Sequence, residues 1–208
     1  MKITELKEGQ KNKQRVNVYT EEGFLCALYL DTIVRYQIGV GKEFSPEELC
    51  AAQREDERQF AFETALQYLS YKMRSKNEVA AKLKSKKISQ EGICYALQKL
   101  TDLHYLDDRE YAKLYAQELS ARFGKLVIEQ KLYQKGIDRQ TVQEVTAGLE
   151  QRDAALQCAQ KLAYKYRGEE LQKRRQKIFR SMLAKGFGFE EIKQAVAQTE
   201  EQMHDEEC

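Results

Sequence analysis

The first forty residues show the hydrophobic pattern of β-structure. Apolar and polar side chains alternate over residues 15–20, as in a half-buried strand, and a second apolar run covers residues 24–30. Glu21-Glu22-Gly23 supplies a turn between the two runs, so the pattern predicts a β-hairpin. Residues 3–6 are a candidate third strand. We therefore expect a small β extension over residues 1–44.

From residue 45 to residue 202 the apolar positions follow helical spacing almost throughout. Ser45-Pro46-Glu47-Glu48 has the features of a helix start: a capping hydroxyl, a proline at the first helical position, and two carboxylates near the positive end of the helix dipole. Pro46 is the only proline of the 208 residues, which favours a mainly helical fold because helix interiors exclude proline. We expect a linker helix over residues 45–59.

One apolar pattern then occurs three times, at intervals of 49 and 50 residues. In every copy, four apolar anchors are separated by three, four and four residues. The anchors are Val79, Leu83, Ile88 and Ile93 in the first copy; Ile128, Leu132, Ile137 and Val142 in the second; and Ile178, Met182, Phe187 and Ile192 in the third.

This spacing predicts a helix, a tight turn and another helix in each copy. Gly136 and Gly186 precede the third anchor, and Lys87 has their place in the first copy; we expect each of these residues to take the left-handed conformation that ends a helix. A further helix precedes each pair, over about residues 60–74, 108–123 and 152–166. The predicted fold is mainly α, with three tandem three-helix repeats in an elongated array. We place the repeats at residues 60–106, 107–150 and 151–202, and an acidic tail at residues 203–208.

Charge is segregated along the chain, which the net charge of +2 conceals. Acidic residues gather in the linker helix and in the C-terminal tail, and basic residues gather around the second helix of every repeat. Placement at the same structural position in each repeat is more informative than any single basic run. The candidate binding residues are Lys72, Arg74, Lys82, Lys84, Lys86, Lys87, Arg122, Lys125, Lys131, Lys135, Lys173, Arg174, Arg175, Lys177 and Arg180.

Two interpretations of these clusters are open. They form a discontinuous positive track that binds a polyanion or an acidic protein, with the salt-sensitive, sequence-independent affinity typical of phosphate contacts. Alternatively, they are solvated helix faces whose lysine stems cover apolar surface. Several tyrosines lie near the clusters and could stack on bases, although their helical spacing also suits core or rim positions. They are Tyr68, Tyr71, Tyr115, Tyr133, Tyr164 and Tyr166.

The sequence offers little support for catalysis, and we expect neither a catalytic residue nor a metal or cofactor. It has no glycine-rich phosphate loop, its five cysteines are scattered, and its two histidines are far apart. Asp107 and Asp108 could serve a metal-dependent nuclease, but helix capping explains them more simply. The chain lacks a membrane-length apolar run and a signal peptide, so we expect a cytoplasmic protein.

An ordered set of motifs occurs between residues 60 and 196. The motifs are Tyr68-Leu69-Ser70-Tyr71-Lys72-Met73-Arg74-Ser75-Lys76-Asn77-Glu78-Val79 with Lys82-Leu83; Tyr105-Leu106-Asp107-Asp108 with Tyr111-Ala112; Gly124 with Ile128 and Leu132; and Arg180 with Met182-Leu183 and Lys185-Gly186-Phe187. Taken together, they resemble the RecX family of RecA regulators. The N-terminal strands resemble the extension of Gram-positive-type members. Lys87 departs from the family pattern, in which a glycine is common at that position.

The resemblance implies a non-enzymatic protein that lies in the helical groove of RecA–DNA filaments and modulates, usually inhibits, RecA in recombination, DNA repair and the SOS response. It also implies weak, nonspecific DNA binding, and we expect a monomer that does not bind membranes. The alternative is an independent DNA-binding protein, because paired helices with tight turns resemble helix-turn-helix units. That alternative predicts a preference for a particular DNA sequence, whereas a protein directed at RecA is expected to bind DNA without such a preference.

Overall fold

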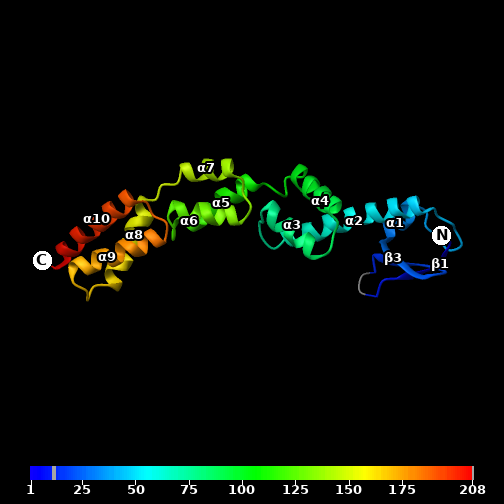
Figure 1. Cartoon of the computed structure of the whole chain (residues 1–208), viewed down its shortest axis with the longest axis horizontal. Helices are drawn as coiled ribbons and strands as arrows, with labels where there is room; N and C mark the ends of the chain where they lie inside the picture. The colour runs from blue at the N-terminus through cyan, green and yellow to red at the C-terminus, as the bar shows by residue number, and fades with distance from the viewer. Residues whose placement is uncertain (11–12, 208) are drawn as a thin grey trace. The chain divides into compact units, whose positions relative to one another are not determined.

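The computed structural model describes residues 1–10 and 13–207, with only the backbone described for residues 204–207. Cys208 and the side chains of Asp205, Glu206 and Glu207, which belong to the predicted acidic tail, lie outside the described residues. Strands β1 (Ile3–Glu8), β2 (Arg15–Thr20) and β3 (Gly23–Tyr29) form an antiparallel sheet in the order β1-β2-β3 (Figure 1). The predicted hairpin and its third strand are confirmed.

A short helix that the sequence pattern did not reveal, α1 (Leu30–Arg35), follows the sheet directly. The sheet core consists of Ile3, Val16, Val18 and Leu28, and apolar residues of α1 and of the next helix complete it. The β extension therefore shares its core with the helices and is not a separate arm.

Helix α2 (Pro46–Leu69) begins with the predicted cap, since Ser45 and Glu48 form a reciprocal capping box. It is one continuous helix, so the expected division into a linker helix over 45–59 and a repeat helix from residue 60 is wrong. No glycine or second proline interrupts this stretch, and small buried residues lie along its length: Ala52 packs on the sheet, and Ala61 and Ala65 pack in the first repeat. The helix ends at Leu69, about five residues before the expected end.

The remaining helices form the three expected three-helix groups (Figure 1). The first group is α2 with α3 (Lys76–Ser85) and α4 (Gln90–Asp102). The second is α5 (Asp108–Ser120), α6 (Lys125–Gln134) and α7 (Arg139–Ala147). The third is α8 (Arg152–Lys165), α9 (Leu171–Ala184) and α10 (Phe189–Glu207). All twelve predicted anchors are buried, and each group has its own core.

The chain forms two compact units, and the repeats do not coincide with them. One unit contains residues 1–73 and 79–106, and the other contains Arg74–Glu78 together with the chain from Asp107 onward. The start of α3 therefore packs with the second repeat. Within the described residues, no helix is both long and apolar enough to cross a membrane.

The turn of one repeat docks on the start of the preceding repeat's second helix. In the second unit, the Ser75 hydroxyl donates to the Lys135 carbonyl at 2.7 Å, and Gly124 N donates to the Lys185 carbonyl at 2.8 Å. The approach is close: a Cβ on Gly136 would lie 2.5 Å from Asn77 Cβ, and one on Gly186 would lie 2.6 Å from Val127 N.

Helix α9 differs from α3 and α6 at this docking position. By anchor spacing, Ser75 and Gly124 correspond to Arg174, but α9 begins three residues earlier, at Leu171. The backbone N–H of Arg174 already donates to the Glu170 carbonyl, at 2.8 Å. An extra turn of helix thus occupies the place where a further repeat would dock.

Candidate functional site

The basic residues of the first repeat are concentrated at the end of α3 and in the turn after it. Lys84, Lys86 and Lys87 are exposed, and none has an acidic partner among the described side chains. Their positions at a helix C-terminus complement the negative end of the dipole, so part of their role is local. Three neighbouring positive charges on the surface also make a strong local attraction for phosphates or carboxylates.

The turn itself is held rigidly by α2. Ser89, the N-cap of α4, donates its backbone N–H to Glu57 Oε1 at 3.0 Å and its hydroxyl to Glu57 Oε2. Lys87 has the left-handed φ of 61° that the sequence pattern predicted for this position. The lysines therefore project from a fixed backbone, which lowers the entropy cost of binding.

Two other candidates in the first repeat are engaged in the protein. Lys82 lies over the Tyr68 ring, 5.5 Å from its centroid, and Arg74 pairs with Glu78 at 3.7 Å. Lys72 is exposed in the segment between α2 and α3, beside the highly exposed Tyr71. Tyr71-Lys72 therefore combines an accessible ring with a positive charge.

In the second repeat, most candidates have structural contacts. Lys131 covers the Phe123 ring at 5.0 Å, Lys125 pairs with Glu129 at 3.9 Å, and Lys135 pairs with Glu78 at 2.7 Å. Arg122 is exposed and has no acidic partner in the described part of the chain.

Glu78 is the centre of a polar cluster in the second unit. Its carboxylate accepts from Lys135 Nζ at 2.7 Å and from Ser75 N at 3.2 Å. Partial burial raises the pKa of Glu78, but the hydrogen bonds from Lys135 and Ser75 and the Lys135 charge outweigh it and lower the pKa below its usual value. Lys135 and Arg74 therefore share one carboxylate as their ion-pair partner.

Helix α9 carries the densest basic run, yet acids from neighbouring segments pair with much of it. Lys173 pairs with Glu170 at 3.5 Å, Lys177 with Glu169, and Arg175 with Glu200 of α10. The Nε of Arg174 is buried. Arg180 is exposed and has no acidic partner among the described side chains.

The structure therefore divides the fifteen candidates into two classes. The exposed residues without an acidic partner in the described ranges are Lys72, Lys84, Lys86, Lys87, Arg122 and Arg180. The other nine are paired with acids, stacked on aromatic rings or partly buried. Half of the first class lies at the α3–α4 turn, which makes this turn the most accessible positive site.

The tyrosines divide in the same way. Tyr71, Tyr133 and Tyr164 are exposed, while Tyr68, Tyr115 and Tyr166 are half-buried against their own repeats. Only the exposed three could offer a ring face to a base without rearrangement.

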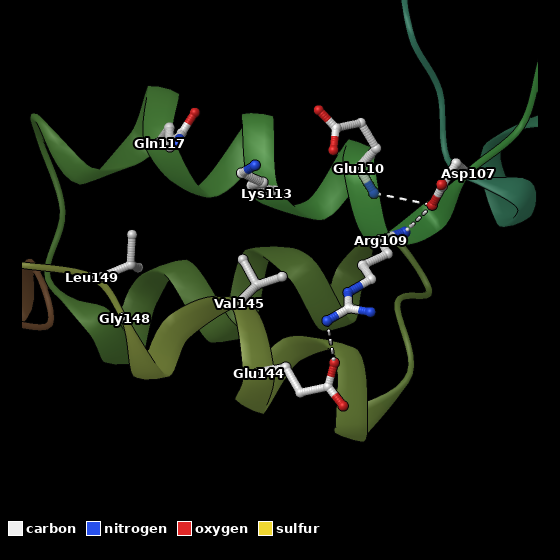
Figure 2. A pocket seen from close by; sticks show the side chains of 9 residues that line it. All are labelled: Asp107, Arg109, Glu110, Lys113, Gln117, Glu144, Val145, Gly148 and Leu149. Carbon is white, nitrogen blue, oxygen red and sulfur yellow. Dashed lines mark hydrogen bonds and ion pairs between the residues drawn. The ribbon is translucent and has the colours of Figure 1, made fainter.

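A hollow of about 520 Å³ lies between α5 and α7 (Figure 2). Asp107, Glu110 and Lys113 line one side, and Arg109 crosses to Glu144 at 3.2 Å (Figure 2). Asp107 caps α5, since its Oδ1 accepts the backbone N–H groups of Arg109 and Glu110 at 2.8 and 3.0 Å.

Asp108, the other acid of the pair, also has a backbone partner. It accepts the N–H of Lys76 at 2.8 Å, and burial raises the pKa of its carboxyl. Asp107 therefore caps α5, as the capping interpretation predicted, whereas Asp108 holds the start of α3. Among the described residues, no three His, Cys, Asp or Glu side chains are grouped to hold a metal ion.

Four family models match successive parts of the chain. They describe the regulatory protein RecX N-terminal domain, matched by residues 1–45, and the RecX first, second and third three-helix domains, matched by residues 61–100, 107–145 and 150–196.

Curated relatives and solved structures agree with these models. The chain is 33% identical to the regulatory protein RecX of Bacillus velezensis, over 98% of this chain and 80% of that protein. It is 32% identical to the protein of the same name from Bacillus licheniformis, over 95% of this chain and 77% of that protein. A crystal structure of regulatory protein RecX superimposes with a TM-score of 0.70 at 28% identity, covering 93% of this chain and 98% of the other. The crystal structure of RecX from Lactobacillus salivarius gives a TM-score of 0.66 at 30% identity, over 70% of this chain and 98% of that one.

Proposed function

Because the chain belongs to the RecX family of regulatory proteins, we propose that it binds the helical groove of RecA–DNA filaments and lowers their ATPase and strand-exchange activity. On this proposal it acts in the cytoplasm, as a monomer, and regulates homologous recombination, DNA repair and the SOS response by binding, with no catalytic step. Its contact with DNA is weak and independent of sequence.

The observation that carries this proposal is the α3–α4 turn. Three exposed lysines without acidic partners in the described residues project there from a backbone that Glu57 fixes. A filament groove offers both DNA phosphates and protein carboxylates, and a rigid cluster of lysines can bind either. Lys72, Arg122 and Arg180, which are exposed and have no acidic partner among the described side chains, extend the same function to other parts of the chain.

The paired cations have a different role on this proposal. Lys135, Arg175 and Lys177 hold the fold through Glu78, Glu200 and Glu169, so they contribute to binding indirectly. The fifteen candidate residues are thereby reduced to six proposed direct contacts.

The test is the single-strand-DNA-dependent ATPase rate of RecA, titrated with this protein at moderate salt. We expect the rate to fall at equimolar or lower ratios. The variant Lys84→Glu/Lys86→Glu/Lys87→Glu should require a much higher concentration, and its binding should lose about one unit of salt dependence for each phosphate contact removed.

A matched control has the same change of net charge at three exposed lysines elsewhere, Lys2→Glu/Lys113→Glu/Lys161→Glu. If inhibition depends on the lysines of the α3–α4 turn and not on net charge, this control should lower the RecA ATPase rate as the wild type does. An unchanged ATPase rate with the wild-type protein would refute the proposal, and persistent DNA binding with preference for one sequence would support the independent DNA-binding alternative.

A further inference from the structure

The third repeat has an exposed apolar patch at the edge of its core. We define the third-repeat patch as Phe179 and Leu183 of α9 and Phe189, the first residue of α10. Phe189 is 61% exposed and Leu183 is 47% exposed. The rings of Phe179 and Phe189 meet edge to face with their centroids 5.2 Å apart, and Leu183 lies one helical turn beyond Phe179.

The other two repeats have no such apolar group at the same three positions. By anchor spacing, the three positions are occupied by Ala80, Lys84 and Gln90 in the first repeat and by Glu129, Tyr133 and Arg139 in the second. The anchors that fill the core are apolar in all three repeats, so the three-helix fold does not require apolar residues at these positions. The patch is therefore a property of the third repeat alone.

Cations outnumber acids around the patch. Arg180 follows Phe179 on α9, and Lys193 lies one turn after Phe189 on α10; both are exposed and have no acidic partner among the described side chains. Glu190, next to Phe189, is an exposed acid, whereas Glu191 is half-buried and accepts the Gly188 N–H at 2.9 Å. An apolar centre with a mainly basic edge fits a protein surface that has an apolar side chain beside carboxylates.

We propose that the third-repeat patch is a protein-docking site, which binds a segment with an apolar anchor residue flanked by Asp or Glu. The inference rests on the proposed function, on which that segment belongs to a RecA protomer of the filament. The patch then supplies apolar contacts to protein, and the α3–α4 turn supplies charge. Contiguous exposed apolar residues of this kind mark interaction sites, whereas isolated ones need no explanation.

A protein partner fits the patch better than a nucleic acid does. Leu183 has no ring to stack on a base, and Phe179 is partly buried in the third-repeat core. Phe189 is therefore the patch residue whose ring is accessible to a base. In the described chain, exposed cations without an acidic partner lie closer together at the α3–α4 turn than around the third-repeat patch.

The test compares Leu183→Ser/Phe189→Ser with the wild type in two assays: binding to preformed RecA filaments on single-stranded DNA, and binding to the same DNA alone. Both substituted side chains are exposed, so the helical circular dichroism and the melting curve should change little. We expect filament affinity to fall about tenfold or more with its salt dependence unchanged, and affinity for DNA alone to stay as it is. The control Leu114→Ser/Leu126→Ser removes two large exposed side chains from the second repeat and should bind filaments like the wild type.

The possible outcomes separate this inference from the proposed function. If the wild type binds filaments and the folded patch variant binds them equally well, the patch is not a docking site and the proposed function stands. If the variant loses affinity for DNA alone to the same extent, Phe189 stacks on nucleic acid and the protein-docking assignment is overturned. If the wild type does not bind filaments, both the inference and the proposed function fail.

Discussion

Position 87 and its equivalents, 136 and 186, show how one backbone requirement can be met by different residues. All three have positive φ, at 61°, 78° and 85°. A left-handed conformation suits glycine and costs other residues about 1–2 kcal/mol, so glycine is expected at every turn. The difference lies in the neighbours: a Cβ at Gly136 or Gly186 would collide with the start of α3 or α6, whereas the structure shows that the Lys87 side chain is exposed.

Substitution at these turns should therefore have unequal effects. We predict that Gly186→Ala destabilises the second unit by about 2 kcal/mol or more, because left-handed strain adds to the clash with Val127. Lys87→Gly should be neutral or slightly stabilising. Urea denaturation followed by circular dichroism measures both, and equal effects of the two substitutions would contradict the docking explanation.

Glu78 gives the second unit a specific dependence on pH. Its pKa is lower in the folded protein than the ordinary value of 4.5, so its contribution to stability is complete above pH 4.5 and is lost as the pH falls through the lowered value. We predict that acidification weakens the docking of residues 74–78, measured as faster amide exchange at the start of α3. Glu78→Gln should remove this acid sensitivity and reduce protection at neutral pH. An unchanged exchange profile in that variant would disprove the role of the ion pairs.

At the scale of elements, anchor spacing predicted the repeat helices well. The twelve anchors determine where each second and third helix lies, because apolar side chains at helical spacing must be buried together. The pattern did not reveal α1, a helix of only six residues, and it placed a break in α2 that the structure lacks. Short helices contain too few residues to show periodicity, and a change of charge along a helix does not end it.

The β extension is fixed to α2 by one partly buried ion pair. Arg15 NH2 lies 2.8 Å from Asp56 Oδ2, and Asp56 Oδ1 also accepts the backbone N–H of Tyr29 at 2.5 Å. The Arg15 guanidinium lies against the Tyr29 and Phe60 rings, 4.8 and 5.2 Å from their centroids. Burial raises the pKa of Asp56, although Tyr29 N–H and Arg15 act in the opposite direction.

Removing this acid should destabilise the first unit. We predict that Asp56→Ala costs about 3 kcal/mol, because it leaves a partly buried cation and a backbone donor without partners. Differential scanning calorimetry measures the change. As a control, Glu55→Ala removes a more exposed acid in the preceding position and should cost less than about 1 kcal/mol. A similar loss in both variants would show that Asp56 has no special role.

At the scale of the whole molecule, the sequence predicted the location of the basic clusters but not their availability. Counting charges along α9 revealed a run without acids, yet Arg175 and Lys177 are paired with Glu200 and Glu169, which lie outside that run. Lys135 is similarly paired with Glu78, 57 residues away in sequence. Pairing between elements depends on tertiary packing, so a residue count within one helix cannot show which cations are accessible. The third-repeat patch was missed for a related reason, since its residues fit helical periodicity and only their exposure distinguishes them from the core.

The early start of α9 also limits how this architecture can be lengthened. A module appended after α10 would meet a helix whose docking position is already covered by its own first turn. A module inserted between α7 and α8 would replace the third repeat at the start of α6, and it would present an equivalent start of its own to the third repeat. Protein engineers who want a longer array from this chain should therefore add copies of the second repeat internally and keep the third repeat last.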